Sequence, residues 1–293
     1  MSNQVRQSTG ISALDERLGG GLMPSGLTVV IGATGVGKTQ LGLQFASAGL
    51  AQEGRRGLIF DMATRGDAQN HKAYAERMFD WRLREMDAAK APDLTRVFHE
   101  APQGDYLRVF DYAGRRVNRA DLSFEGWQDW QAEMARKLAV TIAFFYGNFI
   151  QGARRVVVDG IEPIDRPGDS IQFEMFEYVY HQVIRKEAEW VARDLFRETF
   201  RARQAEVMER RYATNDVGCM LLCTSRESML DDMISRPLDE GDALSNANTL
   251  IYMGRVRDGN RLGRGLYVAK HRGSACTDEI VPYAIDSNGL RVL

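Results

Sequence analysis

The 293-residue sequence has few cysteines, no long apolar run and almost no net charge. Its three cysteines, Cys219, Cys223 and Cys276, are too few and too irregularly spaced for a disulfide framework, and no histidine pair near them indicates zinc. Cys219 and Cys223 fall in the apolar run 217–223, where we expect buried, reduced thiols. This usage is typical of a protein in a reducing cytosol.

Membrane and polyanion partners are not favoured by the composition. No stretch approaches the roughly 18 uninterrupted apolar residues of a membrane span, and residues 1–8 lack the apolar region of a signal peptide. We therefore expect a cytoplasmic protein that has no membrane partner. The formal charge of −2 gives no overall basic field, so nucleic acid is allowed as a partner but not favoured.

The segment 32–39 matches the pattern G-x-x-x-x-G-K-[ST] of a Walker A motif, or P-loop, in full. It reads Gly32, Ala33, Thr34, Gly35, Val36, Gly37, Lys38 and Thr39. The glycines let backbone N–H groups close around phosphate oxygens, the lysine reaches the β- and γ-phosphates, and the threonine hydroxyl ligates Mg²⁺. A strand pattern at 27–31 and a helical pattern at 39–50 flank the motif. We therefore expect a nucleoside triphosphate to bind here.

Short apolar runs that end in a polar residue predict the strands of one sheet. They lie at 27–31, 57–61, 155–159, 217–224, 249–253, 265–270 and 280–285. Long segments with helical patterns separate the first four, which predicts parallel β-α-β units, whereas the last three are close enough to be antiparallel neighbours at one edge. We expect one α/β domain over 1–293, with a mostly parallel central sheet flanked by helices and antiparallel strands at the C-terminal edge.

Two helical elaborations, at about 63–150 and 162–216, exceed a minimal nucleotide-binding core. Apolar residues spaced by three or four over about 121–151 predict a long amphipathic helix that ends at Gly152. A broken apolar stripe predicts a second long helical stretch over about 170–212. Its part 185–211 carries eight basic and six acidic residues, which favours a solvated face over a nucleic-acid patch. We expect these elaborations to select a protein partner.

Two predicted strands end in an acid. A P-loop needs a carboxylate to hold Mg²⁺ through water, and we expect it at the end of a strand adjacent to the P-loop strand. Asp159, which ends the run 155–159, is this Walker B candidate. Asp61 ends the run 58–61 and is the candidate base for the attacking water, or alternatively a turn residue that accepts local backbone hydrogen bonds.

Other polar strand ends offer further candidates. Lys270 and Arg272 are two residues apart and would share one face of a strand, so they can clamp one anion; the alternative is an exposed basic strand end. Thr224 and Ser225 are candidates for sensing the γ-phosphate or positioning water.

With these residues assembled, the chain resembles the RecA-superfamily P-loop ATPases, and within them the KaiC-like branch. Residues 9–22 are similar to the lead-in T-G-I-x-x-L-D-x-x-L-G-G-G, 156–159 to the Walker B strand, and 270–274 to the K-x-R-G-S segment of that family. The elaborations match weakly or not at all.

The resemblance implies a RecA-like core, hydrolysis of ATP with Mg²⁺, and a homo-oligomeric ring, usually a hexamer, with nucleotide held between subunits. In such a ring Lys270 and Arg272 reach the γ-phosphate of ATP bound to the neighbouring subunit. KaiC-type members carry adjacent glutamates where this chain has Asp61 and Met62, so slow hydrolysis is an alternative.

Three functions follow as hypotheses. The motif set favours a ring-forming regulatory or signalling ATPase that acts through protein partners. A DNA recombination or repair ATPase that binds single-stranded DNA is less favoured, because the loop 225–248 carries two arginines against six acidic residues. The departure at Asp61 and Met62 keeps open a nucleotide-dependent assembly scaffold with little hydrolysis.

Overall fold

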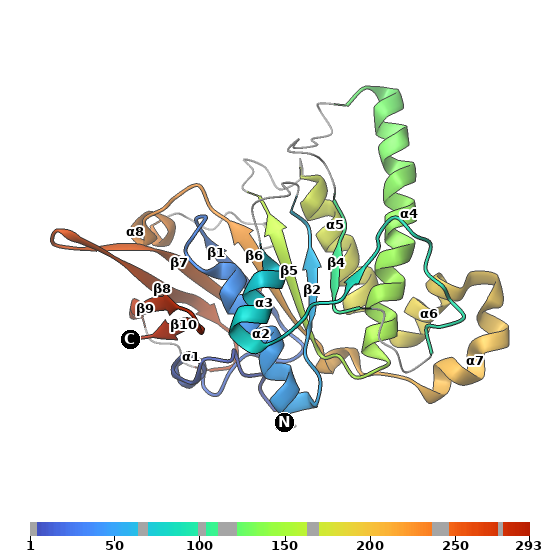
Figure 1. The fold of residues 1–293 in the computed structure, drawn as a ribbon, viewed down its shortest axis with the longest axis horizontal. Helices are drawn as coiled ribbons and strands as arrows, with labels where there is room; N and C mark the ends of the chain where they lie inside the picture. The colour runs from blue at the N-terminus through green and yellow to red at the C-terminus, as the bar shows by residue number, and fades with distance from the viewer. Residues whose placement is uncertain are drawn as a thin grey trace.

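A central sheet organises the computed structural model, which describes residues 5–63, 70–98, 104–110, 122–162, 170–235, 246–274 and 278–293. In these ranges ten strands form one sheet in the order β10-β9-β8-β7-β1-β6-β5-β2-β4-β3. Helices cover both faces of the sheet (Figure 1). The predicted α/β class is confirmed, with a mostly parallel sheet and antiparallel strands at the C-terminal edge, consistent with a RecA-like fold.

The parallel part of the sheet carries the predicted strands at nearly their predicted positions. It consists of β1 (Leu27–Gly32), β6 (Gly218–Thr224), β5 (Arg155–Ile161), β2 (Leu58–Asp61) and the start of β7 (Thr249–Asp258). Two short edge strands, which the sequence did not indicate, extend it beyond β2: β4 (Tyr106–Arg108) and β3 (Glu85–Met86).

The C-terminal strands form the antiparallel edge. β7 pairs in parallel with β1 and antiparallel with β8 (Arg261–His271), so it joins the two parts of the sheet. Next come β9 (Val281–Asp286) and β10 (Gly289–Val292), and β10 was not predicted. Both β7 and β8 run beyond their predicted ends and extend as a hairpin away from the core (Figure 1).

Helices fill the connections between these strands. Their bounds are α1 (Ser12–Arg17), α2 (Lys38–Glu53), α3 (His71–Phe79), α4 (Phe124–Phe149), α5 (Ile171–Val179), α6 (Ala188–Phe196), α7 (Phe200–Glu209) and α8 (Leu230–Ile234). Within the described ranges, no helix combines the length and apolar character needed to cross a membrane.

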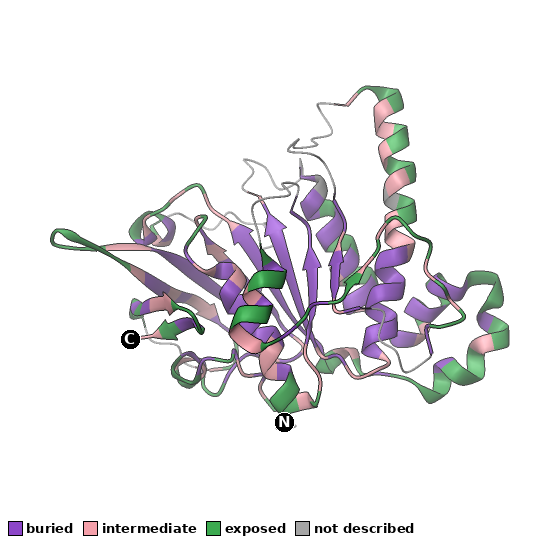
Figure 2. Cartoon of the chain, in the orientation of Figure 1, coloured by how far each residue is buried: buried purple, intermediate pink, exposed green. Residues whose placement is uncertain are grey.

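Two hydrophobic clusters lie on opposite faces of the sheet. In β1, Val29 belongs to the cluster shared with α4 to α6, whereas Val30 belongs to the cluster shared with α1 and α2. Leu221 and Leu222 of β6 divide in the same way. Because successive side chains of a strand point to opposite faces, a strand covered on both sides must be apolar throughout. The central strands are accordingly buried along their length (Figure 2).

Cys219 and Cys223 are both buried in the cluster shared with α4 to α6, as predicted. Burial raises the pKa of Cys219 to about 12, so this thiol stays protonated at neutral pH. Cys276 lies outside the described residues.

The long helix predicted over about 121–151 is confirmed as α4. The Ser123 hydroxyl accepts a hydrogen bond from the N–H of Gly126 as the N-cap, and Gly152 has φ of 96° beyond the C-terminus. The C-terminal half of α4 is buried, while the N-terminal half is exposed or half-buried and projects beyond the rest of the molecule (Figures 1 and 2).

The single long helical stretch predicted over about 170–212 is wrong. A π-helical turn, Tyr180–Ile184, follows α5, and Glu187 leaves the helical region before α6 begins. Arg197, at φ of 45°, then turns the chain between α6 and α7. The apolar stripe is broken because the chain changes direction between these short helices, which pack their apolar residues into the same cluster.

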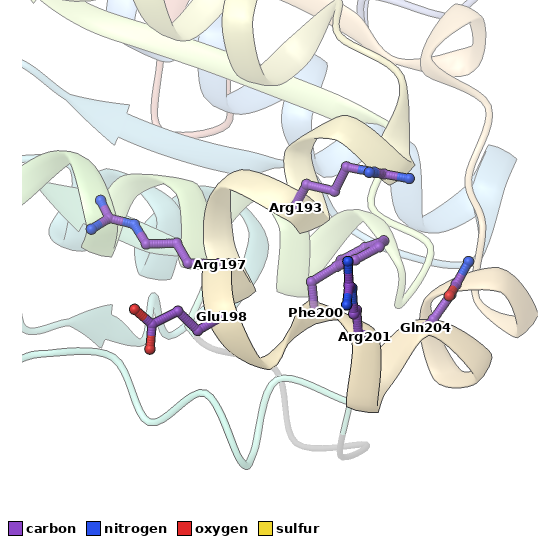
Figure 3. Close-up of a pocket in the computed structure, with 6 residues that line it drawn as sticks. All are labelled: Arg193, Arg197, Glu198, Phe200, Arg201 and Gln204. Carbon is purple, nitrogen blue, oxygen red and sulfur yellow. The ribbon is translucent and has the colours of Figure 1, made fainter.

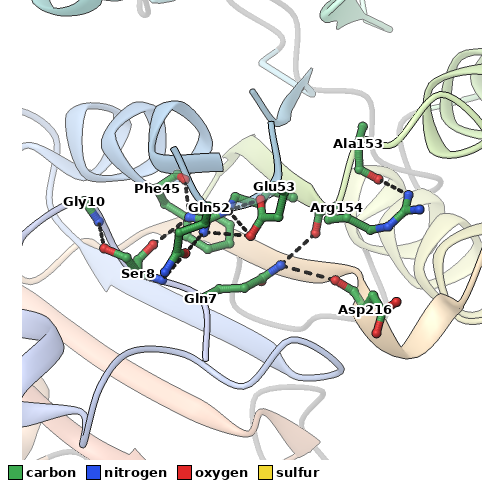
Figure 4. Close-up of polar contacts among 10 residues, drawn as sticks. Gln7, Ser8, Gly10, Phe45, Gln52, Glu53, Ala153, Arg154 and Asp216 are labelled. Carbon is green, nitrogen blue, oxygen red and sulfur yellow. Dashed lines mark hydrogen bonds and ion pairs between the residues drawn. The ribbon is translucent and has the colours of Figure 1, made fainter. Parts of the chain in front are cut away.

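A buried arginine in β5 ties the N-terminal segment to the core. The Arg155 side chain is fully buried, forms an ion pair with Glu53 at the end of α2 (Nε to Oε2, 2.8 Å), and donates to the carbonyls of Ser8 and Phe45 at 2.6 and 2.7 Å. Beside it, Gln7 and Ser8 lie against Gln52 and Glu53 (Figure 4). The N-terminal segment thus supplies acceptors for a charge that cannot reach water.

We expect Arg155→Met to lower the free energy of unfolding by about 3 kcal/mol, the lower end of the range for breaking a buried ion pair, because Glu53 keeps some solvent contact. Urea denaturation measures the change. The control is Arg291→Met, which removes an exposed pair of Arg291 with Asp286 whose closest atoms are 3.9 Å apart. We expect the control to lower the free energy of unfolding by less than about 0.5 kcal/mol. Equal losses in both variants would contradict the structural role of Arg155.

Candidate nucleotide site

The P-loop connects β1 to α2. Gly37 is the N-cap of α2 at φ of 103°, a left-handed conformation that a residue with a Cβ rarely adopts, and a Cβ there would lie 2.6 Å from Ile285 of β9. The Tyr283 hydroxyl, also in β9, donates to the Val36 carbonyl at 2.6 Å. The C-terminal edge of the sheet therefore braces the loop, which the sequence pattern did not indicate.

The Lys38 ammonium lies over the loop. Its Nζ donates to the carbonyls of Gly32 at 2.7 Å and Ala33 at 2.9 Å, and only 8% of the residue is exposed. Burial lowers the pKa of Lys38, against the opposing charge of Asp159. The buried cation faces the loop whose glycines and backbone N–H groups match a phosphate-binding cradle.

Asp159 meets the P-loop helix although its strand is not adjacent to β1. β6 lies between β1 and β5, so the predicted adjacency is wrong. α2 leaves the P-loop and packs across the sheet against β5, and the Thr39 hydroxyl at its start donates to Asp159 Oδ2 at 2.7 Å. The helix, and not strand pairing, brings the two predicted metal ligands together.

Gly160 allows β2 to approach β5 beside this acid. At φ of 95°, a Cβ on Gly160 would lie 2.3 Å from the Ala63 nitrogen, and the pairing of β5 with β6 shifts register between Val158 and Ile161. The Gly160 N–H donates to Asp159 Oδ1 at 2.7 Å. The irregularity thus fixes one oxygen of Asp159 and leaves the other toward Thr39.

His71, the first residue of α3, joins the two acidic strand ends. Asp61 and Asp159 are direct partners in the parallel register of β2 and β5. His71 is 2% exposed, with Nε2 3.0 Å from Asp159 Oδ2 and Nδ1 3.6 Å from Asp61 Oδ2. The Tyr106 hydroxyl of β4 donates to Asp61 Oδ2 at 2.6 Å. Sequence reasoning missed both His71 and Tyr106, because neither belongs to a motif.

The surroundings of the two acids in this cluster shift their pKa values in opposite directions. Burial alone would raise the pKa of Asp159, but hydrogen bonds from His71 and Thr39 and the charge of Lys38 hold it below its usual value. Burial raises the pKa of Asp61, against the charge of His71 and the Tyr106 hydrogen bond. Although burial would lower the pKa of His71, its hydrogen bond to Asp159 and the two carboxylate charges raise it. Asp159 is thus the acid that stays ionised most readily.

Asp61 makes the local contact expected of a turn residue and also faces the cluster. Its Oδ1 accepts from the Ala63 N–H at 2.8 Å, while Oδ2 is directed to Tyr106 and His71. Both alternatives raised by the sequence are therefore compatible with its position, and its part in hydrolysis stays a prediction.

The segment 270–274 packs on the N-terminal lead-in. His271 is buried, its Nδ1 lies 2.9 Å from the Thr249 hydroxyl, and its Nε2 lies 3.0 Å from the Leu18 carbonyl. Lys270 is half-buried and Arg272 is exposed, and burial together with the charge of Arg272 lowers the pKa of Lys270. β8 ends at His271, so Lys270 lies in the strand whereas Arg272 lies beyond its end, and the two do not share the strand face that their spacing predicts. Whether they act in a neighbouring site stays a prediction.

The strand end at Thr224 and Ser225 lies beside the P-loop. Thr224 pairs with Gly32 in the β1–β6 register, and the Ser225 N–H donates to the Gly32 carbonyl at 2.9 Å. Within the loop 225–248, residues 236–245 lie outside the described residues, and with them Arg236, Asp239, Glu240 and Asp242 of the predicted acidic excess.

The residues present fit a magnesium–nucleotide complex. The Thr39 hydroxyl and a buried carboxylate with a lowered pKa already meet at the mouth of the loop. His71 Nδ1 is a buried polar atom without a hydrogen-bond partner in the described structure, so one polar atom of the cluster is still available for a hydrogen bond. Hydroxyl and carboxylate oxygens are the ligands that Mg²⁺ prefers.

Comparison with known proteins finds similarity to KaiC over part of the chain. The family profile "ATPase: KaiC" matches residues 7–103. "Circadian clock oscillator protein KaiC" from Thermostichus vulcanus and from Thermosynechococcus vestitus are each 44% identical to this chain over 59 residues. The match covers 20% of this chain and 11% of each relative. Together with the RecA-like sheet, these matches support placing the chain in the KaiC-like branch of the RecA-superfamily P-loop ATPases.

Proposed function

We propose that the protein binds ATP with Mg²⁺, hydrolyses it, and works as a ring-forming regulatory or signalling ATPase that acts through protein partners. The observation that carries the proposal is the hydrogen bond from Thr39 to the buried Asp159 directly beside the Lys38 ammonium. The proposal takes its nucleotide-binding ATPase class from the family match. Hydrolysis by this chain, the ring, the partners and the cytoplasmic location are inferences beyond that match.

Each part of the P-loop would have a separate task. The backbone N–H groups of residues 33–39 and the Lys38 ammonium would bind the phosphates, and Thr39 with Asp159 would hold Mg²⁺. The bound ion would offset the charge of the phosphate oxygens. Because Asp159 is held by Thr39, His71 and the Gly160 N–H, its carboxylate is oriented before any ligand arrives.

Asp61 is our candidate for the group that takes the proton from the attacking water. Burial raises the pKa of its carboxyl, which makes the ionised form a stronger base than an exposed aspartate. Tyr106 and the Ala63 N–H hold the carboxylate in one orientation. His71 acts as a positioning residue, because it contacts Asp159 and faces Asp61 from the start of α3.

A ring would complete the site with Lys270 and Arg272 of a neighbouring subunit. Three features support this: the resemblance of 270–274 to the family segment, the proximity of the two cations, and the way the buried His271 between them anchors the segment to the lead-in. A hexamer is the family's usual ring.

The helical elaborations offer surfaces for a protein partner. The projecting half of α4 exposes Phe124 at 77%, and α6 exposes Trp190 at 53%. Exposed aromatic side chains are common anchors at interfaces. The assembly-scaffold alternative keeps the same nucleotide site but replaces hydrolysis with binding alone. The single-stranded DNA alternative requires loop 225–248 to bind phosphate despite its acidic excess.

Lys38→Ala should weaken ATP binding at least about 10-fold, because it removes the cation that contacts the β- and γ-phosphates. Isothermal titration calorimetry with Mg²⁺ present measures the change. Lys90→Ala, at an exposed lysine paired with Asp87, is the matched control and should bind ATP like the unaltered protein. Equal affinity of the Lys38→Ala variant and the control would exclude nucleotide binding at this loop.

Asp61→Asn should lower kcat for ATP hydrolysis by at least about 100-fold while ATP affinity changes less than about 3-fold, because it removes the base and leaves the P-loop intact. Asp87→Asn, at an exposed acid, serves as the control. Unaltered protein that turns over ATP no faster than the Lys38→Ala variant would instead support the scaffold. Normal kcat for Asp61→Asn would remove Asp61 from the mechanism.

A mixing experiment tests whether the site is shared. Lys270→Ala/Arg272→Ala and Lys38→Ala should each be inactive alone, whereas a 1:1 mixture of subunits should regain about a quarter of the normal activity, since that fraction of random interfaces pairs an intact P-loop with intact cations. In the control, Arg291→Ala is mixed with Lys38→Ala in place of the double variant, and Arg291→Ala should be fully active alone. A mixture no more active than its parents would contradict cations acting between subunits.

A further inference from the structure

A basic cavity lies at the end of α2 that is remote from the P-loop. It has a volume of about 400 Å³, and its lining includes Arg55, Arg56, Arg82, Arg84 and Asp105. α2 has 16 residues, so it separates this cavity from Lys38 by roughly 24 Å. The cavity is therefore distinct from the nucleotide site described above.

The charge around the cavity is predominantly positive. Four guanidinium groups line it against the single carboxylate of Asp105, although the whole chain has a formal charge of −2. That carboxylate already accepts from Trp81 Nε1 at 2.9 Å and from the Arg84 N–H at 2.5 Å, and its closest distance to the Arg84 side chain is 3.9 Å. Outside the lining, Arg82 Nε also lies 3.4 Å from Glu76 Oε1, so two carboxylates are set against four guanidinium groups and an excess of positive charge remains.

Neutral groups hold the two inner arginines in place. Arg55 donates to the Gln151 carbonyl at 2.8 Å and to Asn148 Oδ1 at 2.5 Å. Burial, and next the charge of Arg84, lower the pKa of Arg55. These contacts fix the orientation of the guanidinium without cancelling its charge.

Arg56 is placed in the same way. It donates to the Phe79 carbonyl at 3.0 Å, and its guanidinium lies over the Trp81 ring, 5.4 Å from the centroid. Its Nε is buried and has no hydrogen-bond partner among the described residues. A buried N–H donor of a cation normally has a hydrogen-bond acceptor, so the unpaired Nε indicates that an acceptor is missing from this cavity.

A second basic hollow, between α6 and α7, lacks these properties. Arg193 lines it but is neutralised by Glu189, with closest atoms 2.8 Å apart, and Glu198 adds a carboxylate to the lining. In Figure 3 the side chains of Arg193 and Arg197 point in opposite directions. Three arginines line this hollow with Glu198, and Arg193 also pairs with Glu189, so the excess of positive charge is smaller than in the cavity at the end of α2.

We propose that the cavity formed by Arg55, Arg56, Arg82 and Arg84 binds a multiply charged oxyanion, a phosphate or diphosphate group. Planar guanidinium groups bind such oxygens in pairs, and a ligand there would supply the missing negative charge. At roughly 30 Å³ for each water, the volume equals about 13 waters, which admits a diphosphate as well as a single small ion. The group can belong to a free solute or to a phosphorylated side chain of a partner protein.

Calorimetric titration of inorganic pyrophosphate into the full-length Lys38→Ala variant tests the site, because that variant weakens competing capture by the P-loop. Arg82 and Arg84 have exposed side chains, at 86% and 57%, so Arg82→Gln/Arg84→Gln added to this background should fold. Arg77→Gln, at an arginine outside the cavity lining, is the matched control. A parallel titration with a phosphoserine peptide distinguishes a carried phosphate from a free one.

We expect pyrophosphate to bind the Lys38→Ala variant and its Arg77→Gln control alike, and the affinity to fall at least about 10-fold with Arg82→Gln/Arg84→Gln. Unchanged melting temperatures without ligand would show that all variants are folded. Binding of the phosphopeptide alone, with the same dependence on Arg82 and Arg84, would assign the site to a phosphorylated partner. Binding of neither probe, or equal affinity in all variants, would overturn the proposal. None of these outcomes depends on ATP binding at the P-loop.

Discussion

The hydrogen bond between Thr39 and Asp159 is the contact on which the nucleotide site depends. It joins the start of α2 to the end of a strand that is separated from β1 by β6. For this contact to form, the P-loop must turn sharply at Gly37, α2 must cross the sheet, and β5 must be buried on both faces. The apolar strands and the two hydrophobic clusters supply that framework. The polar residues Thr39, Asp61, His71 and Asp159 lie at its edge.

The same constraint explains the residues around Asp159. Two acids, Asp61 and Asp159, face each other across paired strands in a buried setting, where two unpaired carboxylates would be costly. Burial would raise the pKa of both acids. For Asp159 the hydrogen bonds from His71 and Thr39 outweigh burial and lower the pKa, whereas for Asp61 burial outweighs the charge of His71 and the Tyr106 hydrogen bond and the pKa rises. The arrangement gives the two acids different pKa values, which suits the roles proposed for them, metal binding for Asp159 and proton abstraction for Asp61.

Local patterns were sufficient to predict α4 and seven of the ten strands among the described residues, because each depends on residues close in sequence, whereas β3, β4 and β10 were missed. Contacts between distant segments were not predictable in this way: the placement of β6 between β1 and β5, the bracing of Val36 by Tyr283, and His71 between the acids. The predicted helix over 170–212 was wrong because a broken apolar stripe does not show where the chain turns at Glu187 and Arg197. The buried Arg155 was likewise hidden inside an apolar strand pattern.

A structure of the protein with Mg²⁺ and a non-hydrolysable ATP analogue would show directly whether Thr39 and Asp159 hold the ion at the P-loop. We expect the triphosphate along residues 32–39, Mg²⁺ beside Thr39 and Asp159, and Lys270 and Arg272 of a neighbouring subunit at the γ-phosphate. A triphosphate bound elsewhere, or a P-loop site closed by residues of its own chain alone, would contradict this expectation.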